Sequence, residues 1–161
     1  MKKATSLRLY SGNGVDLLSH ACQYLCSLKS LYISDSHLES LRFLGAHFSK
    51  VKELTLADCR LRSLDGITSF PNLKILRLPG NEIHNVDQCI YLPQLCHLDV
   101  RSYMPKDRVV TTLASGGLQN VKLAIVGTCL GTWRLVRFRE FLHPTGITFG
   151  YCLVVYCEFE V

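Results

Sequence analysis

Charged residues are scarce in this chain of 161 residues, at 19% of the total, and no apolar run is long enough to cross a membrane. A membrane-spanning helix needs about 18 to 20 consecutive apolar residues. Apolar residues still make up 48% of the chain, which is too many for a disordered segment. The length is sufficient for one domain with a real core. We therefore expect a globular domain that does not enter a membrane.

The sequence also lacks the short motifs that catalysis and nucleotide binding commonly use. It contains no G-x-S-x-G, no H-E-x-x-H and no Walker-type loop. Its histidines are scattered singly, and the glycine pair at residues 116–117 is too short and isolated to hold phosphate. We therefore expect a protein that is not an enzyme and binds no cofactor.

A concentrated charge of one sign is absent as well. The formal net charge is +5, of which residues 1–104 carry +3 (12 Lys/Arg, 9 Asp/Glu) and residues 105–161 carry +2 (6 and 4). A nucleic-acid-binding surface would concentrate basic residues, so we expect no nucleic acid. Residues 1–20 have no uninterrupted apolar core, which predicts that they are not a signal peptide. These features predict a cytoplasmic protein.

A repeat of 22 residues is the strongest positive signal. Val51 begins a segment with the pattern L-x-x-L-x-L-x-x-(N/C)-x-L, and the pattern restarts at Leu73 and again at Leu95. A fixed period of this size with these apolar positions is typical of a leucine-rich repeat solenoid. No single repeat can bury its apolar face alone, so neighbouring repeats must stack.

Each repeat combines a strand signal, a turn signal and a helical signal. Residues 76–78 alternate Leu-Arg-Leu with the period of a strand. Asn81 stands at the turn, where its amide can bond neighbouring backbone groups, and Ser36 and Cys59 are smaller substitutes. Apolar residues then recur every third position over residues 61–70, which is typical of a 3₁₀-like coil. The predicted fold class is α/β, with parallel strands on the concave face and 3₁₀ or short helical segments on the convex face.

The pattern divides the chain into two parts. Residues 1–126 are predicted to form the leucine-rich repeat domain, with about five to six repeats, of which the first and the fifth are irregular. A last strand signature occurs at residues 118–123 and puts Lys122 in line with the earlier outward positions. Residues 127–161 form an irregular C-terminal segment or a cap, in which residues 133–142 can be a short helix or a strand.

Eight cysteines raise the question of disulfides or zinc. Cys59 and Cys89 fall on core positions of the repeat, where a free thiol behaves as a small hydrophobe. His20, Cys22 and Cys26 have ligand-like spacing, but no second Cys/His pair completes four ligands. We therefore expect buried, reduced thiols and no metal.

Residues 61–73, L-x-x-L-D-G-I-x-x-F-P-N-L, resemble the 22-residue subclass of leucine-rich repeat proteins. This subclass includes a regulatory subunit of protein phosphatase 1, an axonemal dynein light chain and a spliceosomal RNP protein. Residues 36–45 and 61–67, with the turn at residues 12–14, resemble more closely a ciliary factor of outer dynein arm assembly and transport. The resemblance covers about residues 4–104.

This resemblance implies a non-catalytic protein–protein interaction module that serves dynein arm assembly or transport in a cilium or flagellum. Two alternatives follow from other members of the subclass. The chain can be a regulatory subunit that docks on a protein phosphatase, or a structural protein of an RNP. The dispersed charge argues against the RNP alternative.

The outward strand positions form the predicted binding surface, because side chains at these positions of successive repeats line up. Tyr and Arg are common there, and they anchor protein interfaces more often than most residues. An ordinary solvated face is the alternative, but solenoid faces commonly bind partners. We expect Tyr32, Glu53, Arg77 and Asp99 to share one continuous exposed face. The predicted protein-binding residues are Arg8, Tyr32, Glu53, Thr55, Arg77, His97, Asp99 and Arg101. The expected partner is a dynein or transport component, or a phosphatase, and the chain is expected to be a monomer.

Overall fold

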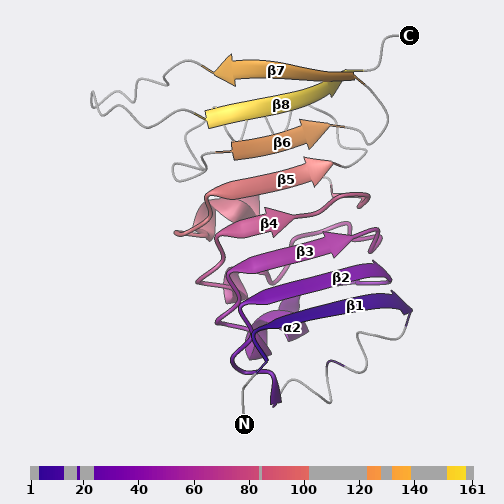
Figure 1. Cartoon of the computed structure of the whole chain (residues 1–161), viewed down its shortest axis with the longest axis vertical. Coiled ribbons are helices and arrows are strands. Elements are labelled where there is room, and N and C mark those ends of the chain that lie inside the picture. The colour runs from indigo at the N-terminus through magenta and orange to yellow at the C-terminus, as the bar shows by residue number, and fades with distance from the viewer. Residues whose placement is uncertain are drawn as a thin grey trace.

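The computed structural model describes residues 4–12, 18, 24–83, 85–101, 123–127, 132–138 and 152–158. The described strands form an eight-stranded sheet with the order β1-β2-β3-β4-β5-β6-β8-β7 (Figure 1). The first five strands come one from each repeat, and each is parallel to the next. Their bounds are β1 (Ser6–Gly12), β2 (Ser30–Ser36), β3 (Glu53–Ala57), β4 (Ile75–Arg77) and β5 (His97–Arg101).

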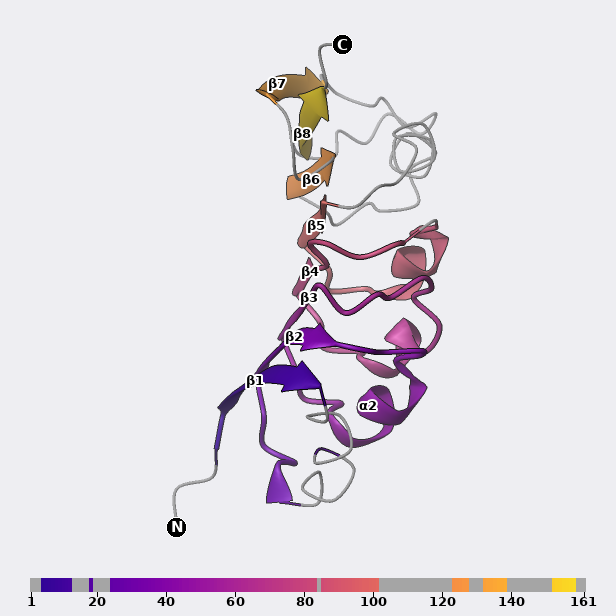
Figure 2. The ribbon, with the colours of Figure 1, turned by 90° about the vertical axis from the view of Figure 1, so that its right-hand side faces the viewer.

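Short helical segments form a second layer behind the sheet (Figure 2). They are α2 (Arg42–His47), η2 (Ile67–Ser69) and η3 (Asp87–Tyr91), and η2 contacts both α2 and η3. The 3₁₀ segments η2 and η3 follow the apolar period of three. The predicted α/β leucine-rich repeat solenoid is therefore confirmed.

Gly66 allows this helical layer to pack closely. Its φ of +92° lies in the left-handed region, where residues with a Cβ are strained. A Cβ at Gly66 would also collide with the backbone of Arg42 at the start of α2. The close approach of two successive repeats therefore depends on glycine at this position.

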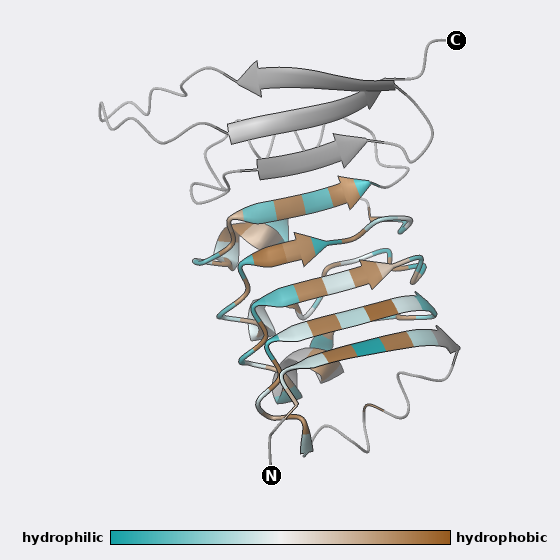
Figure 3. Cartoon of the chain, in the orientation of Figure 1, coloured by the Kyte–Doolittle hydropathy of each residue, from teal (hydrophilic) through white to brown (hydrophobic). Residues whose placement is uncertain are grey.

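The core lies between the sheet and the helical layer. The apolar repeat positions are buried, and hydropathy alternates along several strands, as Figure 3 shows. In the clearest repeat the buried side chains are Val51, Leu54, Leu56, Cys59, Leu61, Leu64, Ile67 and Phe70. Strand alternation explains why Leu54 and Leu56 face inward while Thr55 between them stays partly exposed.

Asn81 connects the third and fourth repeats through its buried amide. Its Oδ1 accepts hydrogen bonds from the backbone N–H groups of Cys59 at 3.0 Å and Leu61 at 3.1 Å. Its Nδ2 donates to the carbonyl oxygens of Leu56 at 2.7 Å and Pro79 at 3.1 Å. Because Asn81 is 0% exposed, water cannot replace these bonds. The predicted stacking role of this asparagine is confirmed.

Cys59 and Ser36 occupy the corresponding positions of the two preceding repeats. The thiol of Cys59 donates to the carbonyl oxygens of Ala57 at 3.2 Å and Ile33 at 3.6 Å. The hydroxyl of Ser36 donates to the carbonyl oxygen of Ser34 at 3.1 Å. Both residues therefore bond neighbouring backbone carbonyls of β2 and β3, as predicted for smaller substitutes of asparagine.

The sheet continues beyond the fifth repeat. Strand β6 (Leu123–Gly127) pairs in parallel with β5, and β8 (Cys152–Glu158) pairs in parallel with β6. Strand β7 (Thr132–Phe138) lies antiparallel to β8 at the end of the sheet (Figure 1). Of the two alternatives for residues 133–142, a helix or a strand, the described part is a strand.

The predicted register of the last repeat was wrong. Asp99 pairs with Ile125, whereas the sequence pattern had put Lys122 in that row. The run from Leu123 to Val126 is apolar at every position, so alternation cannot fix which residues face outward. Residues 118–122, which carried the predicted signature, lie outside the described residues.

The predicted absence of a metal site and of a membrane-spanning helix can be examined only in the described residues. Within the described ranges, no group of three His, Cys, Asp or Glu side chains could hold a metal ion. Cys26 is described and exposed, but His20 and Cys22, its predicted companions, lie outside the described residues. No helix in the described segments is long and apolar enough to cross a membrane.

The thiols of Cys59 and Cys89 are free and 0% exposed, as predicted. Burial raises the pKa of Cys59 to about 11 and that of Cys89 to about 12, from an ordinary value of 9.0. The reactive species is the thiolate, so both should react slowly with a thiol reagent in the folded protein. Time-resolved alkylation with peptide mapping would measure this, with the exposed thiol of Cys26 as the fast control. Labelling of Cys59 and Cys89 as fast as Cys26 would contradict the burial.

Candidate protein-binding face

The sheet face is the surface formed by the outward side chains of β1 to β5. Its central row runs through the paired positions Arg8, Tyr32, Thr55, Arg77 and Asp99. The predicted alignment of these five residues is therefore confirmed. Glu53 and His97 stand in the neighbouring row, on either side of Ile75.

An aromatic patch occupies the β1–β2 end of the sheet face. The rings of Tyr10 and Tyr32 are 5.6 Å apart and tilted by 47°. The guanidinium carbon of Arg8 lies 6.0 Å from the centroid of the Tyr32 ring, within reach of a cation–π contact. Tyr10 is 62% exposed. These contacts hold a large amphipathic surface in place before any partner binds.

Tyr10 is a residue that the predicted set of binding residues left out. It follows Arg8 by two positions in the same strand, so strand alternation puts both on one face. That spacing was the available signal. Its ring contact with Tyr32 depends on the conformations of the two side chains, which the predicted strand register does not give.

Asp99 departs from the expected exposed face. Its side chain is buried, with the residue only 2% exposed. Arg101 explains the burial: its Nε donates to Oδ1 at 2.9 Å and its Nη2 donates to Oδ2 at 2.8 Å. A carboxylate can be buried when both oxygens are bonded in this way. Asp99 therefore orients Arg101, and Arg101, which is partly exposed, is the member that reaches the surface.

The other predicted residues remain accessible. Arg8 and Glu53 are exposed, and Tyr32, Thr55, Arg77 and His97 are partly exposed. Tyr32, Glu53 and Arg77 come from three adjacent strands, so they share one face. The expected continuous surface is thus present without Asp99.

His97 lies on this face in surroundings that disfavour its protonated form. Burial lowers its pKa below the ordinary value of 6.5, the positive charge of Arg77 lowers it further, and Asp99 acts in the opposite direction. Its Nε2 is buried and has no hydrogen-bond partner among the described residues. His97 is therefore neutral at physiological pH and adds no positive charge beside Arg77.

The comparisons with known proteins agree with the repeat architecture. The chain is similar to leucine-rich repeat-containing protein 56 from Homo sapiens, with 39% identity over 84 residues. The corresponding protein from Mus musculus is 39% identical over the same number of residues. The match covers 52% of this chain but only 16% of the human protein and 15% of the mouse protein. No protein-family model matches the chain. The resemblance found in the repeat segments is confirmed.

Proposed function

We propose that this chain is a non-catalytic protein-interaction module whose partner binds the sheet face. The observation that supports this most is the aromatic patch of Arg8, Tyr10 and Tyr32, which continues through Thr55 to Arg77. Tyr and Arg are the side chains that contribute most often to binding energy at protein interfaces. A surface that offers them on rigid, paired strands loses little side-chain freedom when a partner binds.

The size of the face suits a short segment of a partner. Five parallel strands about 4.8 Å apart extend over roughly 20 Å. A helix of about a dozen residues has a similar length. Arg8 and Arg77 form no ion pair within the described part of the chain, so each can pair with an acidic group of the partner.

By its similarity to leucine-rich repeat-containing protein 56, the chain is proposed to act in dynein arm assembly or transport in a cilium or flagellum. Its partner would then be a dynein or transport component, and its place would be the cytoplasm or the cilium. The similarity supports this role only through the aligned 84 residues. A protein of this kind needs no catalytic site, because assembly factors act by holding their partners.

Truncating two side chains of the sheet face should weaken partner binding. We expect Tyr32→Ala combined with Arg77→Ala to reduce affinity by about thirtyfold or more, because anchor residues typically contribute 2 kcal/mol or more. Thermal stability should change little, since both side chains are partly exposed. Affinity purification from ciliated cells with quantitative mass spectrometry would identify the partner, and titration with that purified partner would give the affinity.

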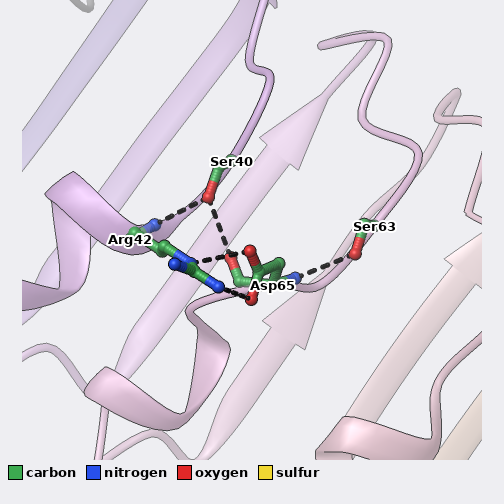
Figure 4. A network of polar contacts seen from close by, with 4 residues as sticks. All are labelled: Ser40, Arg42, Ser63 and Asp65. Atoms are coloured by element: carbon green, nitrogen blue, oxygen red, sulfur yellow. Dashed lines mark hydrogen bonds and ion pairs between the residues drawn. The ribbon is translucent and has the colours of Figure 1, made fainter.

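The matched control lies in the helical layer. Arg42 and Asp65 form a two-bond ion pair at 2.7 Å and 3.1 Å, and Ser40 and Ser63 bond the surrounding backbone (Figure 4). An exposed pair of this kind contributes about 1 kcal/mol or less. Arg42→Ala with Asp65→Ala should therefore leave binding intact. Loss of binding in this control, with binding kept in the sheet-face variant, would assign the partner to the opposite side. Recovery of a phosphatase and no dynein or transport component would refute the ciliary role.

A further inference from the structure

Three lysines occupy equivalent positions in successive repeats, one residue before strands β2, β3 and β4. The carbonyl oxygen of Lys29 accepts a hydrogen bond from the N–H of Lys52 at 2.7 Å, and that of Lys52 accepts from Lys74 at 2.8 Å. These bonds place the three residues side by side at the edge where the strands begin. Lys50 lies two residues before Lys52. We call these four residues the lysine edge.

The lysine edge borders an open hollow of about 380 Å³. Its lining residues are Ser27, Lys29, Lys50, Lys52 and Asn72. All four lysines are exposed, and none forms an ion pair within the described part of the chain. The lining contains no carboxylate. A concave surface lined by charges of one sign concentrates the field and attracts ions of the opposite sign.

Hydrogen bonds between stacked repeats fix the backbone around the hollow before any ligand binds. Asn72 donates a hydrogen bond from Nδ2 to the carbonyl oxygen of Ser49 at 2.9 Å, and Gln94 donates to Oδ1 of Asn72 at 3.4 Å. These bonds connect three repeats beside the lysines. The backbone under the lysines is therefore fixed at the strand spacing of about 4.8 Å. Like charges on neighbouring strands repel one another, and a bound anion reduces that repulsion.

We propose that the lysine edge binds a short acidic segment of a partner protein. Three lysines over about 10 Å match a few aspartate or glutamate side chains on an extended chain, which rises about 3.3 Å per residue. A nucleic acid fits less well, because the lining offers no aromatic side chain for base stacking. This site is separate from the sheet face and does not depend on the function proposed above.

The site is tested with a fluorescent polyglutamate peptide, measured by anisotropy at low and raised salt. The intact chain should bind it, and added salt should weaken binding because the contacts are ionic. Lys29→Gln with Lys52→Gln and Lys74→Gln should weaken binding at least tenfold. Polyglutamine of equal length should not bind.

The control variant removes the same charge elsewhere. Arg42→Gln, Arg60→Gln and Arg62→Gln also remove three positive charges, from exposed positions away from the lysine edge. Its affinity for polyglutamate should stay within about threefold of the intact chain, because distant exposed charges are screened. Equal losses in the two triple variants would overturn the proposal, since attraction would then follow net charge alone.

Two further measurements separate the remaining outcomes. Lys52→Gln alone, at the centre of the row, should weaken binding at least threefold, so that unfolding of the triple variant cannot explain the result. A single-stranded RNA of equal charge that binds more tightly than polyglutamate, and loses affinity in the lysine variant, would overturn the choice of a protein segment. The variant with Tyr32→Ala and Arg77→Ala should keep polyglutamate binding. The two proposals can therefore fail independently.

Discussion

Asn81→Leu should lower the free energy of unfolding by about 3 kcal/mol or more. Leucine has the same branching of side-chain heavy atoms as asparagine, with bulkier methyl groups, and cannot hydrogen-bond, so the change removes every polar contact of the amide. It leaves the N–H groups of Cys59 and Leu61 and the carbonyl oxygen of Leu56 without the partner that Asn81 supplied. A buried polar group left unsatisfied costs about 1 to 3 kcal/mol. Urea unfolding, compared with the unchanged protein, would measure the loss.

Asn72→Leu is the control for this measurement. The amide of Asn72 also donates to a backbone carbonyl of the preceding repeat, that of Ser49 at 2.9 Å. Asn72 is partly exposed, so water can replace the lost bond. We expect a loss below about 1 kcal/mol. If the two replacements proved equally costly, the turn asparagine would have no special part in joining the repeats.

The repeat architecture could be predicted because the residue type at each repeat position is determined by local backbone conformation and burial. Asn81 stands where the chain turns and Leu76 where the strand faces inward, and the 22-residue period repeats these assignments. In a solenoid each repeat contacts mainly its neighbours, so a local pattern fixes the whole stack. The alignment of Arg8, Tyr32 and Arg77 across the strands followed directly from this register.

Burial of particular outward side chains could not be predicted in the same way. Strand alternation gives the face on which Asp99 lies, but Arg101 determines whether solvent reaches it. The residue that pairs with Asp99 on the next strand was predicted wrongly, because residues 123–126 are apolar at every position. Both outcomes depend on a specific contact, the Asp99–Arg101 ion pair in one case and the pairing of β5 with β6 in the other. The 22-residue period contains no information about such contacts.

The lysine edge illustrates a different limit. Its members Lys29, Lys52 and Lys74 are 23 and 22 residues apart, and the only charged residues within two positions of any of them are Lys50 and Glu53, both beside Lys52. A search for basic blocks along the chain therefore finds only dispersed charge. Folding brings these lysines side by side, because backbone hydrogen bonds between Lys29, Lys52 and Lys74 join consecutive repeats. A comparison of the charge at equivalent positions of successive repeats would have revealed the row of lysines.

Leu76→Ala should reduce the free energy of unfolding by about 2 to 5 kcal/mol, which is the usual cost of truncating a buried leucine. Leu76 is 0% exposed, and its backbone pairs with Leu54 on one side and Leu98 on the other. Both the transfer cost and the cavity cost therefore apply.

Ile75→Ala in the same strand supplies the comparison for Leu76→Ala. Ile75 is the neighbour of Leu76 but is only partly buried, on the sheet face. Its truncation loses less apolar burial than truncation of the fully buried Leu76, so we expect a loss of about 1 kcal/mol. Denaturant midpoints and slopes measured on both variants would give the two values. A loss well under 1 kcal/mol for Leu76→Ala, or a larger loss for Ile75→Ala, would mean that the inward and outward positions of β4 are exchanged.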